Sequence, residues 1–361
     1  MSAAEGRLPE RLARRLGAAM PPALRAAMAA GGFLEATGAA PEDGSLPPLP
    51  AAPEHDLEAM LALTRLAAAH AAPLPLAETM LGHYALALAG LAPPLGPMTI
   101  GPVLPPAGVV RFAAGALRGR LHRLPWARQA VAAAVVVVEG DQARTILAGR
   151  PAVLERGQNL AGEPRDLVLL DDTPVLAAGA PGRGLTPAGL YRLGALFRAA
   201  AMAGALTQVA DLTLRHVRRR REDGRRPLAR AAVAEDMLRL AAEAAAARAV
   251  TAAAGQAAAG GAASLEDAGF AIACAKQRAS AAAGTGATLA HRLQGVAALA
   301  PDHPLPALTR RLWAWRDEFG GEAEWAAWIG ARARAAGGAG LWPLVADRGR
   351  MRAATEEAPN E

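Results

Sequence analysis

The stretch Asp302-His-Pro-Leu-Pro-Ala-Leu-Thr-Arg-Arg-Leu-Trp-Ala-Trp-Arg-Asp-Glu-Phe-Gly-Gly321 carries most of the information about the fold. Asp302 stands where a helix N-cap would, and Pro304 suits a first turn because its missing N–H would have no helical partner there. The apolar residues that follow share one helix face: Leu305, Leu308, Leu312 and Trp315. The glycines at 320 and 321 predict the end of this helix, because glycine adopts the left-handed conformation without strain.

Two carboxylates, Asp317 and Glu318, stand directly before those glycines. A carboxylate at a helix C-terminus meets the negative end of the helix dipole, so its position there needs a reason. One interpretation is a solvated helix end. The other is a general base directed into a cleft, and the rest of the chain has to decide between them.

The composition indicates a globular protein of two or three domains, with 361 residues of which 52% are hydrophobic. Only 4% are aromatic, so alanine, leucine and valine must do most of the packing. The formal net charge is +6, yet Lys276 is the only lysine and every other basic residue is arginine. This bias follows the general richness in Ala, Gly, Pro and Arg, and the charge is weak evidence for a polyanionic partner.

Cysteine and apolar runs limit the compartment. Cys274 is the only cysteine, which excludes an intrachain disulfide and a thiolate metal cluster. The N-terminal residues mix Glu and Arg with apolar residues and do not form a secretory signal. The most apolar run, 130–138, is too short to span a bilayer. We therefore expect a cytoplasmic protein without a membrane span.

The pattern along the chain predicts three regions and a tail. Residues 1–92 form an N-terminal helical domain, with amphipathic helices at 57–72 and 74–91. Residues 93–182 form a β domain of six or seven short strands, among them 132–139, 145–147, 152–155, 166–170 and 173–178, with a turn at Asp171-Asp172. Residues 183–343 form a helical bundle, and 344–361 a disordered tail.

The bundle is expected to hold four or five helices. Thr186 and Pro187 are a good N-cap and first residue for a helix that runs to about Glu222. Further helices are predicted at 228–258, at 265–297, in the opening stretch 302–321 and at 322–335. The fold class is thus mainly α with a small β domain, in the order helical domain, β domain, helical bundle.

Several chemistries lack their motifs. No His-Glu-x-x-His, Cys-x-x-Cys or paired-histidine spacing occurs, so no zinc or di-iron site is expected. A Walker A motif and a Gly-x-Ser-x-Gly elbow are also missing. The basic run 216–226 allows three interpretations: a dipole-matched helix end, a nucleic-acid contact, or a clamp for a pyrophosphate. Nucleic-acid binding is the most remote, because no stacking aromatics are interleaved.

Several segments together resemble the flavin-dependent acyl-CoA dehydrogenases. These are Pro75-Leu-Ala-Glu-Thr-Met80, Leu124-Pro-Trp-Ala-Arg128, Ala275-Lys-Gln-Arg-Ala-Ser280, Leu293-Gln-Gly-Val296, Asp302-His-Pro-Leu305 and Thr309 to Gly320. The order of the three regions is also similar to that family. The resemblance implies the acyl-CoA dehydrogenase fold, with a middle domain that is barrel-like and a C-terminal four-helix bundle.

The resemblance also implies an activity: α,β-dehydrogenation of an acyl-CoA thioester in fatty acid metabolism. A carboxylate takes the α-proton, and the β-hydrogen leaves as hydride to FAD held between the β domain and the bundle. Counting without gaps from Pro304 places the family's base at Phe319, and a slip of one residue places it at Glu318. Four residues match cofactor-binding positions: Arg221, Gln294, Gly295 and Trp126. Relatives bind flavin across subunit contacts, which implies a homodimer, a homotetramer or a heteromer.

The chain departs from the family pattern at several flavin contacts. Residues 98–106 read Met-Thr-Ile-Gly-Pro-Val-Leu-Pro-Pro instead of a Thr-Glu-Pro-Gly-Ala-Gly-like loop. Ala231-Ala232 replaces the usual Phe-Gln, and only Gly295 remains of a glycine pair. The alternative to an active enzyme is therefore a non-catalytic relative that pairs with an active dehydrogenase subunit.

Overall fold

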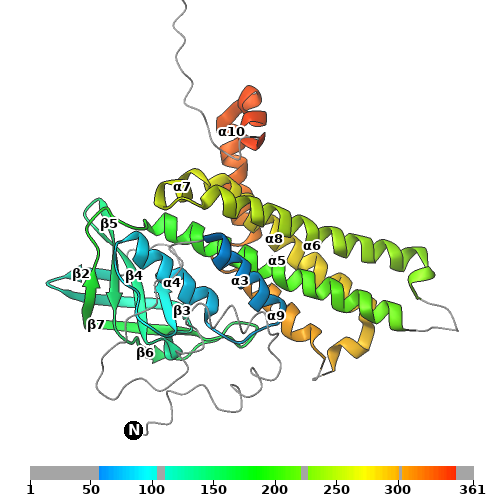
Figure 1. The fold of residues 1–361 in the computed structure, drawn as a ribbon, viewed down its shortest axis with the longest axis horizontal. Helices are drawn as coiled ribbons and strands as arrows, with labels where there is room; N and C mark the ends of the chain where they lie inside the picture. The colour runs from blue at the N-terminus through cyan, green and yellow to red at the C-terminus, as the bar shows by residue number, and fades with distance from the viewer. Residues whose placement is uncertain (1–56, 104–109, 221–226, 301–302, 347–361) are drawn as a thin grey trace, which may run out of the picture.

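The computed structural model describes residues 57–103, 110–220, 227–300 and 303–346. Within them, two N-terminal helices, a seven-stranded β domain and a bundle of long helices follow one another along the chain. Figure 1 shows the β domain at one end of the molecule and the long helices extending away from it. The predicted fold class, mainly α with a small β domain, is confirmed.

The two N-terminal helices are α3 (Leu57–Ala69) and α4 (Leu76–Leu88), close to the predicted ranges. Helix α3 packs on the first bundle helix, and α4 covers the first strands of the β domain. The two helices therefore lie where the β domain and the bundle meet (Figure 1). The predicted helical segments before residue 57 lie outside the described residues.

The β domain is one sheet in the order β1-β4-β5-β7-β3-β2, with β6 paired to β7. The β1–β4 pair is parallel and the other pairs are antiparallel. The strands are β1 (Met98–Gly101), β2 (Val110–Ala113), β3 (Ala116–Pro125), β4 (Ala132–Glu139), β5 (Gln142–Ala148), β6 (Ala152–Glu155) and β7 (Arg165–Ala178).

The surroundings of strand β4 explain why its sequence does not alternate between apolar and polar residues. Ala133, Val135 and Val137 belong to the core inside the β domain. Ala132, Ala134 and Val136 belong to the core shared with the helices. Both faces of the strand are thus buried, as successive side chains in a strand point to opposite faces. The strands predicted at 132–139 and 152–155 are confirmed.

One predicted turn in the β domain is wrong. Asp171 and Asp172 lie inside the continuous strand β7. Opposite them the register between β3 and β7 shifts, and Asp172 has a φ of 45°. The two aspartates form a bulge, which places polar residues in a strand without ending it.

The bundle begins as the sequence predicts. Helix α5 (Pro187–Arg219) is capped by Thr186, whose hydroxyl accepts a hydrogen bond of 2.9 Å from the amide of Gly189. The bundle continues with η3 (Pro227–Ala229), α6 (Ala231–Ala258), α7 (Ala262–Asp267), α8 (Gly269–Gln294), η4 (Gly295–Leu299) and α9 (Leu305–Arg316). Instead of the single helix predicted at 265–297, the structure has α7, α8 and η4. The helix is interrupted at Ala268 and again at Gly295.

Helix α5 is the central element of the bundle and is long and apolar enough to cross a membrane. Its apolar window, however, is 83% buried inside the fold. Packing against α3, α6, α8 and α9 accounts for that apolarity.

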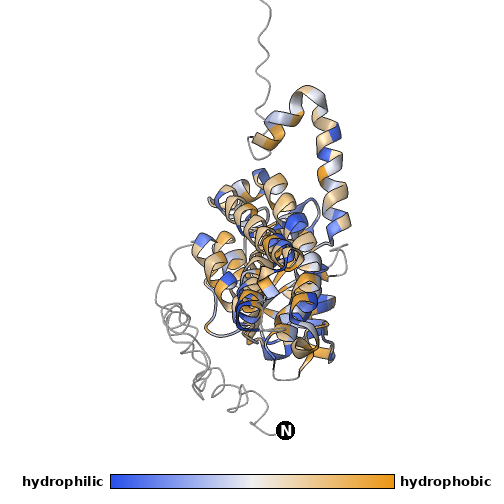
Figure 2. Ribbon diagram, turned by 90° about the vertical axis from the view of Figure 1, so that its right-hand side faces the viewer, coloured by the Kyte–Doolittle hydropathy of each residue, from blue (hydrophilic) through white to orange (hydrophobic). Residues whose placement is uncertain are grey.

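Helix α9 ends at Arg316, earlier than its two glycines predict. Phe319 and Gly320 follow with φ angles of 53° and 90° and form a tight turn into α10 (Glu322–Ala346). Figure 2 shows α10 leaving the body of the bundle and bending, and the break lies at Gly337. The predicted tail is therefore wrong for residues 344–346, which are helical; the rest of it, like Asp302, lies outside the described residues.

Candidate functional site

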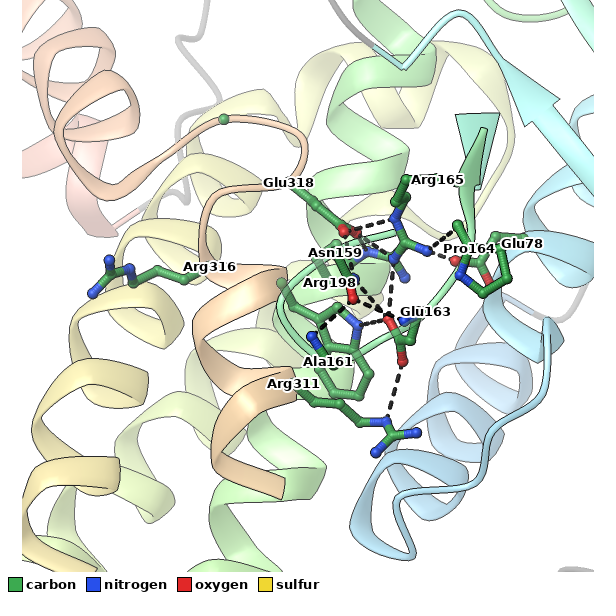
Figure 3. Close-up of polar contacts among 12 residues, drawn as sticks. Glu78, Asn159, Ala161, Glu163, Pro164, Arg165, Arg198, Arg311, Arg316 and Glu318 are labelled. Carbon is green, nitrogen blue, oxygen red and sulfur yellow. Dashed lines mark hydrogen bonds and ion pairs between the residues drawn. The ribbon is translucent and has the colours of Figure 1, made fainter. Parts of the chain in front are cut away.

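Six acidic and basic side chains converge where α4, the β domain, α5 and α9 with the turn after it meet (Figure 3). Five are between 3% and 7% exposed, and the side chain of the sixth, Glu318, is 11% exposed. Three are arginines and three are glutamates, so the cluster is electrically neutral: Glu78, Glu163, Arg165, Arg198, Arg311 and Glu318. Below, these six residues are called the buried cluster.

Glu318 accepts four hydrogen bonds from three side chains. Arg165 donates to both of its oxygens, from Nε at 2.7 Å and from Nη2 at 2.9 Å. Arg198 adds a bond of 2.7 Å from Nε, and Asn159 adds one of 3.0 Å from Nδ2. Two guanidinium groups and an amide thus surround one carboxylate.

This surrounding decides the protonation of Glu318. Burial alone would raise its pKa, but the charges of Arg165 and Arg198 outweigh burial and lower the pKa to about 2. A group with so low a pKa stays ionised, but it has little affinity for a proton taken from carbon. In this arrangement Glu318 is an ion-pair partner and a poor general base.

Arg198 connects the cluster to the N-terminal helices. Its Nη2 donates to Oε1 of Glu78 on α4 at 2.6 Å, while its Nε holds Glu318. From Leu193 to Ala210, Arg198 is the only charged residue of α5. A lone arginine in such an apolar run must be buried, and a buried charge needs partners. That sequence signal could have revealed the cluster.

Glu163 is the second centre. Its two oxygens accept from Arg311 at 3.1 Å, from Trp315 Nε1 at 2.9 Å, from Arg165 Nη2 at 3.1 Å and from Asn159 at 2.9 Å. Arg311 and Trp315 lie one turn apart on α9 and point to the same carboxylate. The stretch that decides the fold therefore also ties the bundle to the β domain.

Backbone strain gathers around the same cluster. Arg123, Trp126 and Phe319 have φ angles of 53°, 56° and 53°, values that non-glycine residues rarely adopt. The ring of Phe319 fits only because residue 194 on α5 is glycine: a Cβ there would lie 2.3 Å from the ring. Such strain persists where the surroundings enforce it and is typical of functional sites.

The interface that holds the cluster has little free space. One cavity of about 50 Å³ lies beside Arg123, Arg165 and Glu318, and another of about 30 Å³ lies beside Trp126, Glu78 and Arg198. Each is near the volume of one or two water molecules, and ligand sites are commonly 300 Å³ or more. These two cavities between the described parts of the β domain and the bundle are therefore too small for a flavin ring.

A third, much larger cavity of about 400 Å³ lies at the far end of the bundle. It is formed by the last turns of α5, the end of α8 and the segment before α9: Leu212, Arg215, His216, Arg219, Arg220, Gln294 and His303. We call it the basic pocket. The basic run therefore ends α5 with dipole-matched charges, as one interpretation predicted, and its side chains also line a cavity.

The basic pocket offers donors and an unused acceptor. The side-chain amide of Gln294 donates to the hydroxyl of Thr213 at 2.8 Å, and its Oε1 is buried without a partner among the described residues. Gly295 turns the chain with a φ of 66° next to Arg220. Burial, together with Arg220 and His303, lowers the pKa of His216. The arginines fit an anionic group such as the diphosphate of a dinucleotide.

The structure thus divides the predicted site residues between two places. Glu318 and Trp126 lie at the interface with the β domain, and Gln294 and Gly295 lie at the basic pocket. Arg221 lies outside the described residues. The sequence interpretation missed the other members of the buried cluster, because they come from four separate segments.

Comparison with known proteins supports the resemblance. Residues 192–333 match the C-terminal domain of acyl-CoA dehydrogenases, which covers the bundle from α5 into α10. No curated protein sequence matches the chain. The resemblance to acyl-CoA dehydrogenases that the sequence predicted is therefore confirmed, and it is the resemblance of a divergent relative.

Solved structures extend the likeness beyond the bundle. The ChsE4–ChsE5 complex of Mycobacterium tuberculosis matches with a TM-score of 0.68 at 17% identity, over 90% of this chain and 95% of that one. A glutaryl-coenzyme A dehydrogenase in complex with glutaryl-CoA matches with a TM-score of 0.65 at 16% identity, over 88% and 87%. The butyryl-CoA dehydrogenase of Megasphaera elsdenii matches with 0.63 at 16%, over 76% and 80%. The chain has the acyl-CoA dehydrogenase fold.

Proposed function

We propose that this chain is a subunit of a flavin-dependent acyl-CoA dehydrogenase assembly, that its own dehydrogenation centre is closed, and that it pairs with a catalytic subunit of the same fold. The observation that carries the proposal is the bonding of Glu318 to Arg165 and Arg198. This bonding lies at the interface where the resemblance places flavin and substrate, and it takes the base candidate named from the sequence, Glu318, out of use.

The basic pocket gives the subunit a role in the pair. Arg219, Gln294 and Gly295 would hold the diphosphate and nucleotide part of FAD, while the partner holds the ring. The flavin, when bound, accepts the hydride released from the acyl chain. Two named chains occur together in the ChsE4–ChsE5 complex, which supports pairing as the mode of assembly.

A second candidate is the active acyl-CoA dehydrogenase with Glu318 as its base. The position of Glu318 favours it, because the carboxylate lies between the β domain and the bundle. The reaction would then require Glu318 to leave both arginines, which would raise its pKa toward that of a free carboxylate.

The experiment is to purify the chain alone and together with an acyl-CoA dehydrogenase-fold chain encoded beside it. We expect the chain alone to stay colourless after incubation with FAD, and the pair to bind FAD and oxidise an acyl-CoA. Glu318→Gln in this chain should leave the rate of the pair unchanged. The proposal is wrong if the chain alone binds FAD and its activity disappears in Glu318→Gln, the result that the second candidate requires.

Two further expectations accompany the proposal. An acyl-CoA remains the substrate class of the assembly, and its chain length is set by the partner in which the thioester binds. The cytoplasmic location and the oligomeric state stay predictions, which cell fractionation and light scattering of the pair would test.

A further inference from the structure

Lys276, the only lysine of the chain, lies on α8 and is fully buried. Its ammonium donates to the carbonyl oxygens of Arg316 at 2.7 Å and Gly320 at 2.6 Å. A third bond of 3.2 Å reaches the hydroxyl of Ser280, one turn further along α8. Three acceptors therefore meet the three donors of an ammonium group.

The bonding pattern explains why a lysine and not an arginine stands there. A guanidinium is planar and carries five N–H donors, whereas an ammonium is compact and carries three. The hydroxyl of Ser280 lies 3.3 Å from the carbonyl of Arg316 and donates to it, so it can only accept from Lys276. The arrangement is complete only while Lys276 is protonated.

The two carbonyls that Lys276 holds flank Glu318 on both sides. Arg316 is the last residue of α9, and Gly320 ends the tight turn that follows. Within this turn, Phe319 has a left-handed backbone, and its carbonyl accepts a bond of 2.9 Å from Trp325 Nε1. The turn between Asp317 and Gly320 is thus pinned at its two ends from α8 and at its middle from α10.

We infer that Lys276 is a positioning residue that clamps the turn 317–320 and thereby holds the carboxylate of Glu318 between Arg165 and Arg198. The inference rests on the proposed function in treating Glu318 as the group that closes the site. The hydrogen bonds themselves do not depend on it, so the test can address the clamp directly.

The clamp is sensitive to pH near neutrality. Burial lowers the pKa of Lys276 to about 7, although the charges of Glu318 and Asp317 oppose this shift. The other charged groups that face it are Arg198 on α5, which lowers the pKa further, and Glu324 on α10, which raises it. Above that pH a neutral amine keeps two donors for three acceptors, and the turn loses one restraint.

Loss of this proton does not unfold the protein. Because the folded pKa lies below 10.5, the unfolded chain binds more protons between about pH 7 and 10.5, and the contribution of Lys276 to stability rises with pH there. Local loosening of the turn and a steady or rising global stability are therefore expected together. This combination distinguishes a positioning role from a merely structural one.

Because Lys276 is the only lysine, the first measurement can follow the titration of its amine without overlap from other lysines. Protein labelled with ¹³C at lysine Cε has one side-chain resonance, which should titrate near pH 7. Amine acylation mapped by peptide mass should leave Lys276 unmodified at neutral pH. Rapid acylation of Lys276 would overturn the inference, because it shows a solvated amine outside the clamp, and a resonance that titrates near 10.5 would overturn the pH sensitivity of the clamp.

The second measurement is hydrogen exchange by mass spectrometry on Lys276→Met. We expect peptides that cover 313–325 to exchange at least tenfold faster than in the wild type, and peptides of α6 to be unchanged. Raising the pH of the wild type from 6 to 9 should accelerate the same peptides beyond the intrinsic pH dependence. Arg278→Met is the matched control, since Arg278 lies on the same helix and pairs with Glu243 instead.

The outcomes separate the inference from the proposed function. If Lys276→Met leaves exchange at 313–325 as it is in the wild type or in Arg278→Met, the clamp is wrong, whatever the flavin content of the assembly. If exchange rises locally but the chain alone proves to be an active flavoprotein, the clamp stands and the proposed function is wrong. Ser280→Ala removes one acceptor without touching the charge and should give a smaller increase at the same peptides.

Discussion

The buried cluster and the basic pocket differ in almost every physical property, although both contain several arginines. In the cluster three guanidinium groups are matched by three carboxylates, and the cavities beside them hold about 30 and 50 Å³. In the pocket Arg215, Arg219 and Arg220 surround about 400 Å³ together with two histidines. The first region is closed and satisfied, and the second is open and cationic.

This difference indicates which part of a shared ligand each region could still bind. A closed, neutral interior has no net charge to attract an anion and no room for a ring system. An open pocket with exposed arginines can accept an anion at little structural cost. A chain of this fold that has lost one function and kept the other is suited to completing a site on a neighbouring subunit.

The largest expected effect comes from removing an arginine at the centre of the cluster. Arg198→Met leaves Glu78 and Glu318 buried without their shared cation, which should reduce the free energy of unfolding by about 3–5 kcal/mol. Urea denaturation followed by circular dichroism measures this loss.

Arg215→Met is the matched control for that experiment, because it makes the same substitution on the same helix. Among the described residues Arg215 pairs with Asp211, and its side chain is 45% exposed. We expect a change below about 0.5 kcal/mol. Equal losses in the two variants would contradict the contrast between a matched interior and an open pocket.

The second prediction concerns acid. The pKa of Glu318 is lowered from 4.5 to about 2, so the stability that it contributes is present above about pH 4.5 and is lost as the pH falls toward 2. The loss should be on the order of 3 kcal/mol. Glu318→Gln should be less stable at pH 7 and should show a flatter acid limb in the same denaturation series, whereas exposed Asp317→Asn should follow the wild type. An unchanged acid limb in Glu318→Gln would show that the arginines do not hold this carboxylate.

Much of this fold could be predicted from local pattern. The cap at Thr186 and the two-sided apolar run of β4 use rules that act within a few residues, and both predictions are confirmed. The bulge at Asp171 and Asp172 was misread as a turn, because only the partner strand β3 shows that the chain continues. The same limit applies at Ala268, where a helical pattern continues across a break.

The candidate site was harder to predict because its geometry is non-local. Glu318 could be named from the sequence, but its meaning depends on Arg165 and Arg198, which are 153 and 120 residues away. An isolated carboxylate before two glycines is compatible with a base, and two guanidinium groups turn it into an ion-pair partner. The lone arginine in the apolar run of α5 and the lone lysine of the chain were the signals available, since buried charges require partners.

The third prediction tests the pocket with ADP, which carries the diphosphate and the nucleoside. Arg219→Met should raise the Kd for ADP roughly tenfold, because a charge-assisted hydrogen bond contributes about 1.5–3 kcal/mol. Binding should also weaken with added salt. Isothermal titration calorimetry measures both effects, and exposed Arg239→Met on α6 serves as the control. An equal rise in Kd for both variants would show that ADP responds to net charge and not to the pocket.

The smallest expected effect is at an ion pair that has the geometry of the cluster but none of its burial. Arg118 and Asp172 form the same two-pronged contact as Arg165 and Glu318, with Nε on one oxygen and Nη2 on the other. Their side chains are 70% and 58% exposed, so water and salt screen the pair. Arg118→Ala should leave the unfolding temperature unchanged in differential scanning calorimetry. If it lowered that temperature as much as Arg198→Met does, fork geometry rather than burial would set the strength of these pairs, and the closed state of the cluster would need another explanation.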